Sequence, residues 1–119
     1  MSGGSELVGR WRAQDLGGSP LRDDVASTIE FGGDGRVAGD AGVNRFGGSY
    51  RVEGDAIELG PLHSTRMAGP EPAMRQEREF LTALSGRRSF AIDGEALVIG
   101  QGPEQVRLLR VDEAPWAAT

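Results

Sequence analysis

Short turn signals recur along this chain at regular spacing, and they constrain its fold more than any other feature. Gly and Asp-Gly clusters stand at residues 32–35, 53–55, 93–95 and 100–103. Between these clusters apolar and polar residues alternate, as where Ile29 and Phe31 flank Glu30. Alternation of this kind is the period of a half-buried strand, and regular turns between short strands predict a meander of hairpins.

Nine short strands are predicted, and together they indicate a small curled antiparallel sheet or an open barrel. Their ranges are 7–14, 25–31, 35–39, 46–52, 55–59, 62–67, 87–93, 95–99 and 105–111. A chain of 119 residues is typical of one domain and buries roughly two thirds of its surface on folding. We therefore expect a single domain over residues 7–111, with a flexible N-terminus at 1–6 and a tail at 112–119.

Residues 72–85 depart from the strand period and predict one amphipathic helix. The apolar residues at helical spacing are Met74, Phe80, Leu81 and Leu84. Pro72 suits the first helical turn and Gly86 suits the end of the helix. Such a helix has to bury its apolar side, so the fold class is mainly β (α+β), with the helix packed on the inner face of the sheet.

Charge and residue usage exclude several classes of function. The formal charge of -5 and the pI near 4.8 oppose binding to nucleic acid or to anionic lipid. The chain has no Cys and only one His, His63, so no thiolate or multi-His metal site is expected. No stretch is apolar enough for a membrane span. We predict no metal, no cofactor and no nucleic-acid partner.

Three stretches carry a more specific pattern: Gly39-Asp-Ala-Gly-Val-Asn-Arg-Phe-Gly-Gly-Ser-Tyr50, Ser64-Thr-Arg-Met67 and, in the predicted helix, Glu77-x-x-Phe80-Leu81-x-x-Leu84. They resemble the motifs of the META domain family, which includes HslJ-like bacterial heat-shock proteins. The resemblance covers nearly the whole chain. It implies the fold and a link to stress, and it implies no catalytic activity, because none is established for the family.

Two departures from the family pattern bear on the compartment. Family members commonly carry Cys directly before the Asn and again shortly after the Met, where this chain has Val43 and the residues near Gly69. If exported relatives use that pair of Cys residues as a disulfide, the loss of both residues indicates a cytoplasmic protein, since a disulfide is of no use in a reducing compartment. A removed export or lipoprotein signal stays as the alternative.

One dense polar group is the candidate binding surface. Its residues are Asn44, Arg45, Tyr50, Ser64, Thr65 and Arg66. In the functional interpretation the two arginines hold a carboxylate or phosphate and the tyrosine gives an apolar wall. In the structural interpretation, which is favoured, Asn44 takes a left-handed turn conformation, Ser64 and Thr65 bond to nearby backbone, and the arginines lie over the sheet.

No catalytic residue is predicted. The carboxylate pairs fall at turns, in the tail or, for Glu77 with Glu79, on a helix face that we expect to be solvated. The leading hypothesis is a non-enzymatic binding or accessory module, a monomer or weak homodimer, whose partner is a protein or peptide. The alternative is a small-molecule-binding barrel, such as a biosynthetic accessory or cyclase-like protein. The residues expected to line its internal pocket are Phe46, Tyr50, Met67 and Phe90.

Overall fold

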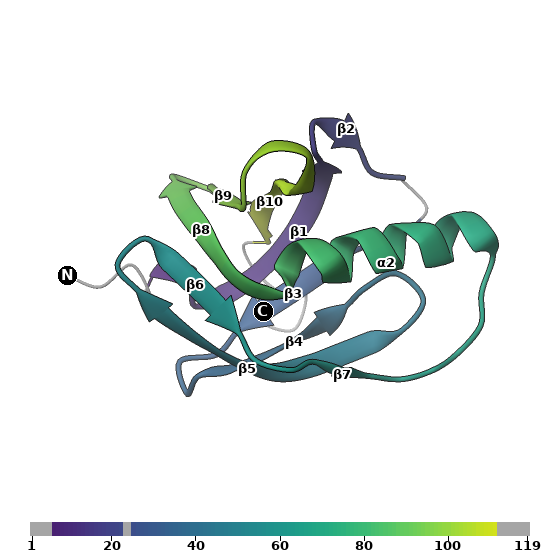
Figure 1. The fold of residues 1–119 in the computed structure, drawn as a ribbon, viewed down its shortest axis with the longest axis horizontal. Helices are drawn as coiled ribbons and strands as arrows, with labels where there is room; N and C mark the ends of the chain where they lie inside the picture. Colours follow the sequence, from purple (N-terminus) through teal and green to yellow (C-terminus); the bar gives the residue numbers. More distant parts are fainter. Residues whose placement is uncertain (1–5, 23–24, 112–119) are drawn as a thin grey trace, which may run out of the picture.

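The computed structural model describes residues 6–22 and 25–111, and its strands form one antiparallel sheet of ten strands (Figure 1). The strands are β1 (Gly9–Leu16), β2 (Ser19–Pro20), β3 (Thr28–Phe31), β4 (Arg36–Asp40), β5 (Arg45–Glu53), β6 (Ala56–Leu59), β7 (His63–Ser64), β8 (Gly86–Asp93), β9 (Ala96–Ile99) and β10 (Val106–Val111). The α-helix is α2 (Glu71–Leu84), and a 3₁₀ turn, η1, covers Gly102–Glu104. Residues 1–5 and 112–119 of the two predicted ends lie outside the described residues.

Eight of the strands close into a barrel. They follow the order β1-β3-β4-β5-β6-β8-β9-β10, and β10 then pairs with β1 from Arg10↔Val111 to Leu16↔Val106. The predicted mainly β fold is therefore confirmed. Turn signals report only local hairpins, so the closing pair, which joins the two ends of the domain, could not be read from them.

Large side chains fill the barrel interior. Trp11, Phe31 and Phe80 are essentially fully buried, and burying a side chain of this kind contributes about 1.5–3 kcal/mol. The Trp11 indole donates a 2.9 Å hydrogen bond to the carbonyl oxygen of Leu7, as expected for a core tryptophan. Met67, an expected lining residue of the internal pocket, is instead 56% exposed. The small-molecule pocket is therefore not favoured.

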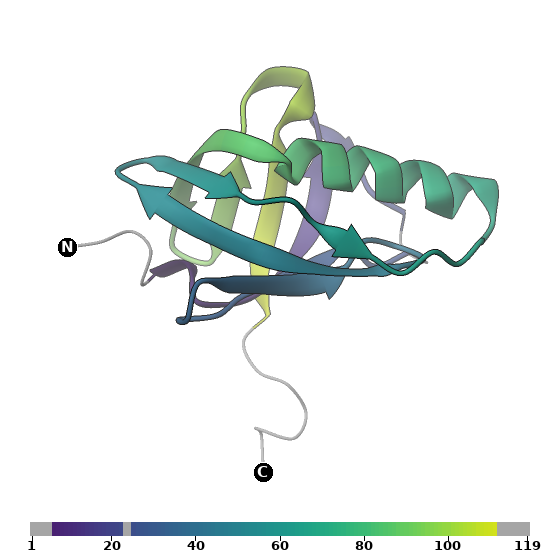
Figure 2. The ribbon, with the colours of Figure 1, turned by 60° about the horizontal axis from the view of Figure 1, so that its bottom comes forward.

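Helix α2 lies along one side of the barrel, above β5 and β7 (Figures 1 and 2). Its Phe80 ring meets the Phe46 ring edge to face, with the centroids 6.2 Å apart. Phe80 and Leu84 are completely buried, whereas Met74 and Leu81 are half-buried at the margin. The predicted docking of the helix on the inner face of the sheet is thus confirmed, although its buried side is rotated from the predicted one.

Candidate functional site

The rotated helix buries a carboxylate. Glu77 is only 7% exposed, so its predicted place on a solvated face is wrong. Its Oε1 accepts hydrogen bonds from the backbone N–H groups of Val43 (2.8 Å) and Asn44 (2.7 Å). Gly42, with φ +147°, lets the loop between β4 and β5 approach the helix closely, because a Cβ there would lie 3.3 Å from the Ala73 carbonyl oxygen.

Asn44 extends this network to a third segment of the chain. Its Nδ2 donates to Glu77 Oε2 at 2.8 Å and to the Met67 carbonyl oxygen at 3.1 Å. Its Oδ1 accepts from the Met67 N–H at 2.6 Å and from the Thr65 hydroxyl at 2.8 Å. The left-handed conformation expected for Asn44 is wrong, since every described residue with positive φ is a glycine. The three motif stretches therefore meet in one hydrogen-bond network, which is buried at Asn44 and Glu77 and partly buried at Thr65 and Met67.

The ionisation of Glu77 follows from these contacts. Burial raises the pKa of the Glu77 carboxyl, but hydrogen bonds from Asn44 and Val43, together with the charge of Arg78, outweigh it and set the pKa below the ordinary value of 4.5. The carboxylate is therefore charged at neutral pH. No buried side-chain nitrogen or oxygen among the described residues lacks a hydrogen-bond partner.

A second polar anchor holds the other side of α2. The Gln76 Nε2 donates to the Val25 carbonyl oxygen and to the Ser27 hydroxyl, both at 3.0 Å, and its Oε1 accepts from the Arg22 N–H at 3.1 Å. The sequence prediction assigned no role to Gln76. For Glu77 a signal existed, since it stands three positions before Phe80 in the helix and so shares the apolar side.

The segment after β6 is less regular than predicted. A strand was expected over 62–67, but β7 contains only His63 and Ser64, which pair with Gly47 and Phe46 of β5. The Thr65 N–H still donates to the Arg45 carbonyl oxygen at 3.0 Å. Beyond Thr65, the backbone of Met67 bonds to the Asn44 side chain instead of to a strand. The regular hydrogen-bond ladder between β5 and β7 therefore ends before Met67.

The outer edge of this segment faces solvent. In an antiparallel pair successive residues point their backbone groups to opposite sides. Because Thr65 turns toward β5, the N–H and C=O groups of Ser64 and Arg66 point away from it. Among the described strands only β5 pairs with β7, and His63 through Ala68 are all exposed. We call residues 62–68 with this unpaired side the β7 edge.

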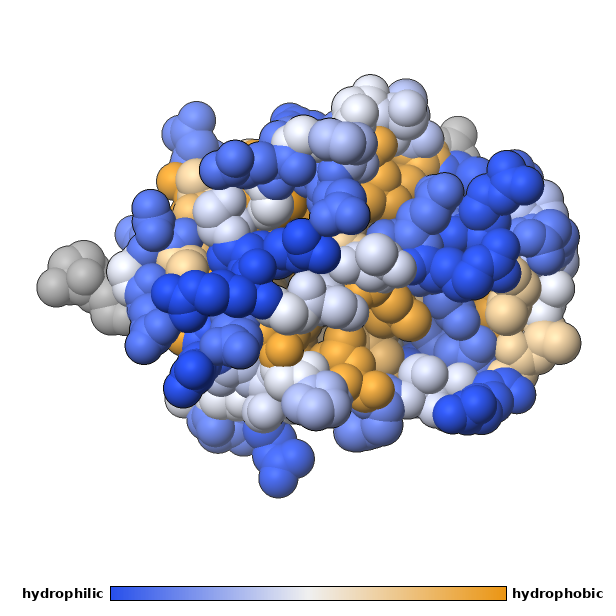
Figure 3. Space-filling model, in the orientation of Figure 1, coloured by the Kyte–Doolittle hydropathy of each residue, from blue (hydrophilic) through white to orange (hydrophobic). Residues whose placement is uncertain are grey.

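Apolar surface lies beside the β7 edge. Figure 3 shows hydrophobic side chains between α2 and β7, framed by charged ones. Leu62, next to β7 in the chain, and Leu81 of α2 are partly buried and pack against the core. Met67 is one of the two exposed large hydrophobic residues among those described. A strand added to the edge would cover part of this surface.

The structure separates the predicted binding residues. Asn44 and Thr65 belong to the hydrogen-bond network with Glu77, while the side chains of Arg45, Ser64 and Arg66 are exposed on or beside the β7 edge. Tyr50 does not join them. Its hydroxyl donates to the Gly32 carbonyl oxygen at 2.7 Å, and its ring packs edge to face on Phe31.

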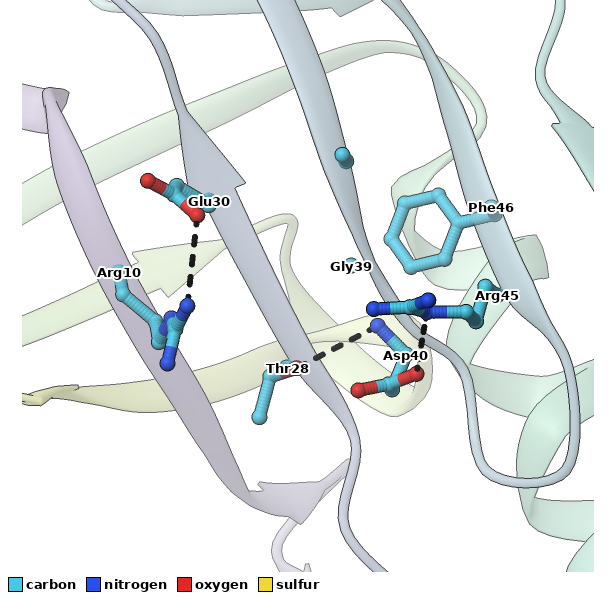
Figure 4. A pocket seen from close by; sticks show the side chains of 8 residues that line it. Arg10, Thr28, Glu30, Gly39, Asp40, Arg45 and Phe46 are labelled. Carbon is cyan, nitrogen blue, oxygen red and sulfur yellow. Dashed lines mark hydrogen bonds and ion pairs between the residues drawn. The ribbon is translucent and has the colours of Figure 1, made fainter. Parts of the chain in front are cut away.

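A second candidate is a hollow of about 420 Å³ on the outer face of β1, β3, β4 and β5 (Figure 4). Two ion pairs border it, Arg10 with Glu30 at 3.6 Å and Arg45 with Asp40 at 3.7 Å. Both pairs are solvent-exposed, so each contributes about 0–1 kcal/mol. The hollow is open and its charges already face one another, which makes it the weaker candidate.

A cluster of metal-ligating side chains or a long apolar helix within residues 6–22 and 25–111 would indicate another kind of site. No three side chains of the His, Cys, Asp or Glu type gather there as a metal site would require. No helix in those residues has the length and apolar character needed to cross a membrane.

These features define the class of protein: a closed eight-stranded antiparallel barrel with one helix, locked to two loops by a buried Asn–Glu network. The sequence matches the META domain family over residues 5–115, and the chain belongs to this family. The resemblance seen in the motifs is thereby confirmed. No curated protein matches the sequence significantly.

Solved structures share the fold. One protein determined by NMR superposes with a TM-score of 0.76 at 17% identity, over 94% of this chain and 97% of its own. A second NMR structure, of a protein from Burkholderia xenovorans, has a TM-score of 0.71 at 20% identity, over 92% and 87% of the two chains. At these identities the likeness supports the barrel and says nothing of a ligand.

Proposed function

We propose that this META domain protein is a non-enzymatic binding module that takes up an extended segment of a partner protein at the β7 edge. The observation that carries the proposal is the unpaired row of backbone groups on Ser64 and Arg66. An exposed strand edge is a template for strand addition, in which backbone hydrogen bonds give affinity and alternate side chains give specificity.

Strand addition satisfies groups that the edge now presents to water. Pairing of Ser64 and Arg66 forms up to four backbone hydrogen bonds, each with a net value of about 0.5–1.5 kcal/mol. The added strand also covers apolar surface of Leu62, which is only partly buried. Because Asn44 already holds the backbone of Met67 in place, binding does not require the edge to be ordered first.

The cellular setting is part of the proposal. The chain has no Cys, which suits a reducing compartment and supports a cytoplasmic protein. Its membership of the META domain family, with heat-shock-linked members, supports an accessory role in a bacterial stress response.

The test uses a short β-forming probe and amide NMR. We expect the acetylated and amidated hexapeptide Thr-Val-Thr-Val-Thr-Val to shift the amide signals of Ser64 and Arg66 and to slow their hydrogen exchange. Signals from β9 and β10, on another part of the barrel, should not move. A peptide that perturbs other surfaces and leaves these two amides unchanged contradicts the proposal.

A pair of variants isolates the backbone contribution. Ser64→Pro removes an outward N–H without touching the bond from Thr65 to Arg45, so it should abolish the shifts. Ser64→Ala removes only the hydroxyl and should bind like the wild type. Equal binding by the two variants would show that the edge does not pair with the peptide.

A further inference from the structure

The chemistry of the partner follows from the side chains that flank the unpaired backbone, and this inference rests on the proposed function. Ser64 lies opposite Phe46 across the β5–β7 pair, and Phe46 points into the barrel with 4% of its surface exposed. Cross-strand neighbours share a face of the sheet, so Ser64 points to the side that α2 covers. Leu62 and Arg66, each two positions away, point to the same side.

Leu62, Ser64 and Arg66 thus form a row of side chains, and its Leu62 end is apolar. Leu62 is partly buried against the hydrophobic core, and a Cβ placed on Gly48 would come within 2.9 Å of its Cδ2. Leu62 therefore sits tightly on the inner side of β5. A partner residue opposite Leu62 would meet this apolar side chain, an environment that favours an aliphatic side chain.

The other end of the row is basic. Arg66 is exposed, and it makes no hydrogen bond or ion pair with any residue that the structure describes. The surrounding sequence, Pro61-Leu-His-Ser-Thr-Arg-Met-Ala-Gly69, contains no acidic residue although the chain as a whole carries a charge of -5. A carboxylate opposite Arg66 would form a cross-strand ion pair in an otherwise unmatched position.

We infer that the partner segment is an acidic, extended peptide that pairs antiparallel to β7, with a Glu or Asp opposite Arg66 and an aliphatic residue opposite Leu62. Antiparallel pairing continues the ladder of β5 with β7 and is the more stable arrangement per residue. In this register the acidic residue precedes the aliphatic one by four positions, with a small or aliphatic residue between them opposite Ser64.

The inference is tested with two capped peptides, Thr-Glu-Thr-Val-Thr-Leu-Thr and the same sequence with Lys in place of Glu. On the wild-type protein the Glu peptide should bind at least about threefold more tightly, and the difference should shrink as salt is raised. On Arg66→Glu the order of the two peptides should reverse. Arg12→Glu makes the same change of charge at an exposed position of β1 and should leave the order unchanged.

Three results would contradict the inference, and they can be told apart. Equal affinity for both peptides, with the Ser64 and Arg66 amides still shifting, overturns the acidic partner but leaves strand addition at β7 intact. No shift of these amides with either peptide overturns the proposed function as well. Edge amides that are protected without peptide, in a dimer that dissociates on dilution, would show that a second copy of this chain occupies the edge.

Discussion

Asn44 and Glu77 are separated by 33 residues in the chain, yet their side chains share a 2.8 Å hydrogen bond in the interior. Through this bond the helix holds the β4–β5 loop, and Asn44 in turn holds the backbone of Met67. The Asn44 side-chain amide thus supplies the hydrogen bonds that a paired strand would otherwise give to the backbone of Met67. The candidate binding edge is therefore positioned by α2.

Removal of the carboxylate should destabilise the fold. Glu77→Ala leaves three N–H groups without an acceptor, the backbone N–H groups of Val43 and Asn44 and one of the two N–H groups of Asn44 Nδ2. The other Nδ2 N–H keeps the Met67 carbonyl oxygen. Each unsatisfied buried donor costs about 1–3 kcal/mol, so the free energy of unfolding should fall by about 3 kcal/mol or more. Glu79→Ala, on the exposed side of the same helix, should change it by less than about 0.5 kcal/mol. Urea unfolding that gives equal losses would exclude a structural role for the network.

Acid should weaken the fold through the same group. The pKa of Glu77 is lower in the folded protein than its ordinary value of 4.5, so the unfolded chain binds this proton more readily. Its contribution to stability is therefore complete above about pH 4.5 and is lost as the pH falls through the folded pKa. Glu77→Gln, which does not titrate, should flatten the acid side of the stability profile. An unchanged slope below pH 4.5 would contradict this assignment.

The sequence was sufficient for most of the fold because its signals are local. Alternation around Ile29 and the helical period around Phe80 each reflect burial of one side of a single element. Closure of β1 on β10 and the burial of Glu77 depend on partners far away in the chain. The spacing of Glu77 from Phe80 placed it on the apolar side of the helix, but its partner Asn44 lies 33 residues away and gives no local signal, so the carboxylate was predicted to be solvated.

Only part of the candidate site was predicted, again because the sequence signals are local. Composition located Ser64, Thr65 and Arg66 in an unusually polar stretch, and all three are exposed. The distinction between Thr65, which faces β5, and its two neighbours depends on the register with Arg45. Register is a long-range property, and it decides which backbone groups are open to a partner.

Gly39 is expected to tolerate no side chain. A Cβ at this position would collide with the carbonyl oxygen of Thr28 and lie 2.9 Å from the Cα of Ile29 in the neighbouring strand. Gly39→Ala should therefore lower stability by about 1–3 kcal/mol, as overpacking does in other cores. Gly33 has open space around it, so Gly33→Ala is the matched control. If Gly39→Ala and Gly33→Ala lower the melting temperature equally, the close approach of β3 and β4 is not the reason that a glycine is needed at position 39.

Phe80 should be the main apolar contribution of the helix. It is completely buried and meets Phe46 edge to face. Phe80→Ala should cost about 3–5 kcal/mol, measured by urea unfolding. Thr82→Ala, at an exposed position two residues later, serves as the control. A melting temperature that does not change in Phe80→Ala would show that α2 does not dock on the barrel.

Alanine variants of Arg45 and Arg66 should show that neither arginine stabilises the fold and that only Arg66 binds the peptide. The Arg45 side chain is 82% exposed and lies 3.7 Å from Asp40, and such a pair contributes about 0–1 kcal/mol. Arg66 makes no ion pair with any of the residues that the structure describes, so alanine at either position should leave unfolding nearly unchanged. Only Arg66→Ala should weaken binding of the Glu peptide, because Arg45 points to the opposite face of the sheet from Phe46, its neighbour in β5. A collapse of folding in both variants would instead make the two arginines structural, and the β7 edge would lose its charged anchor.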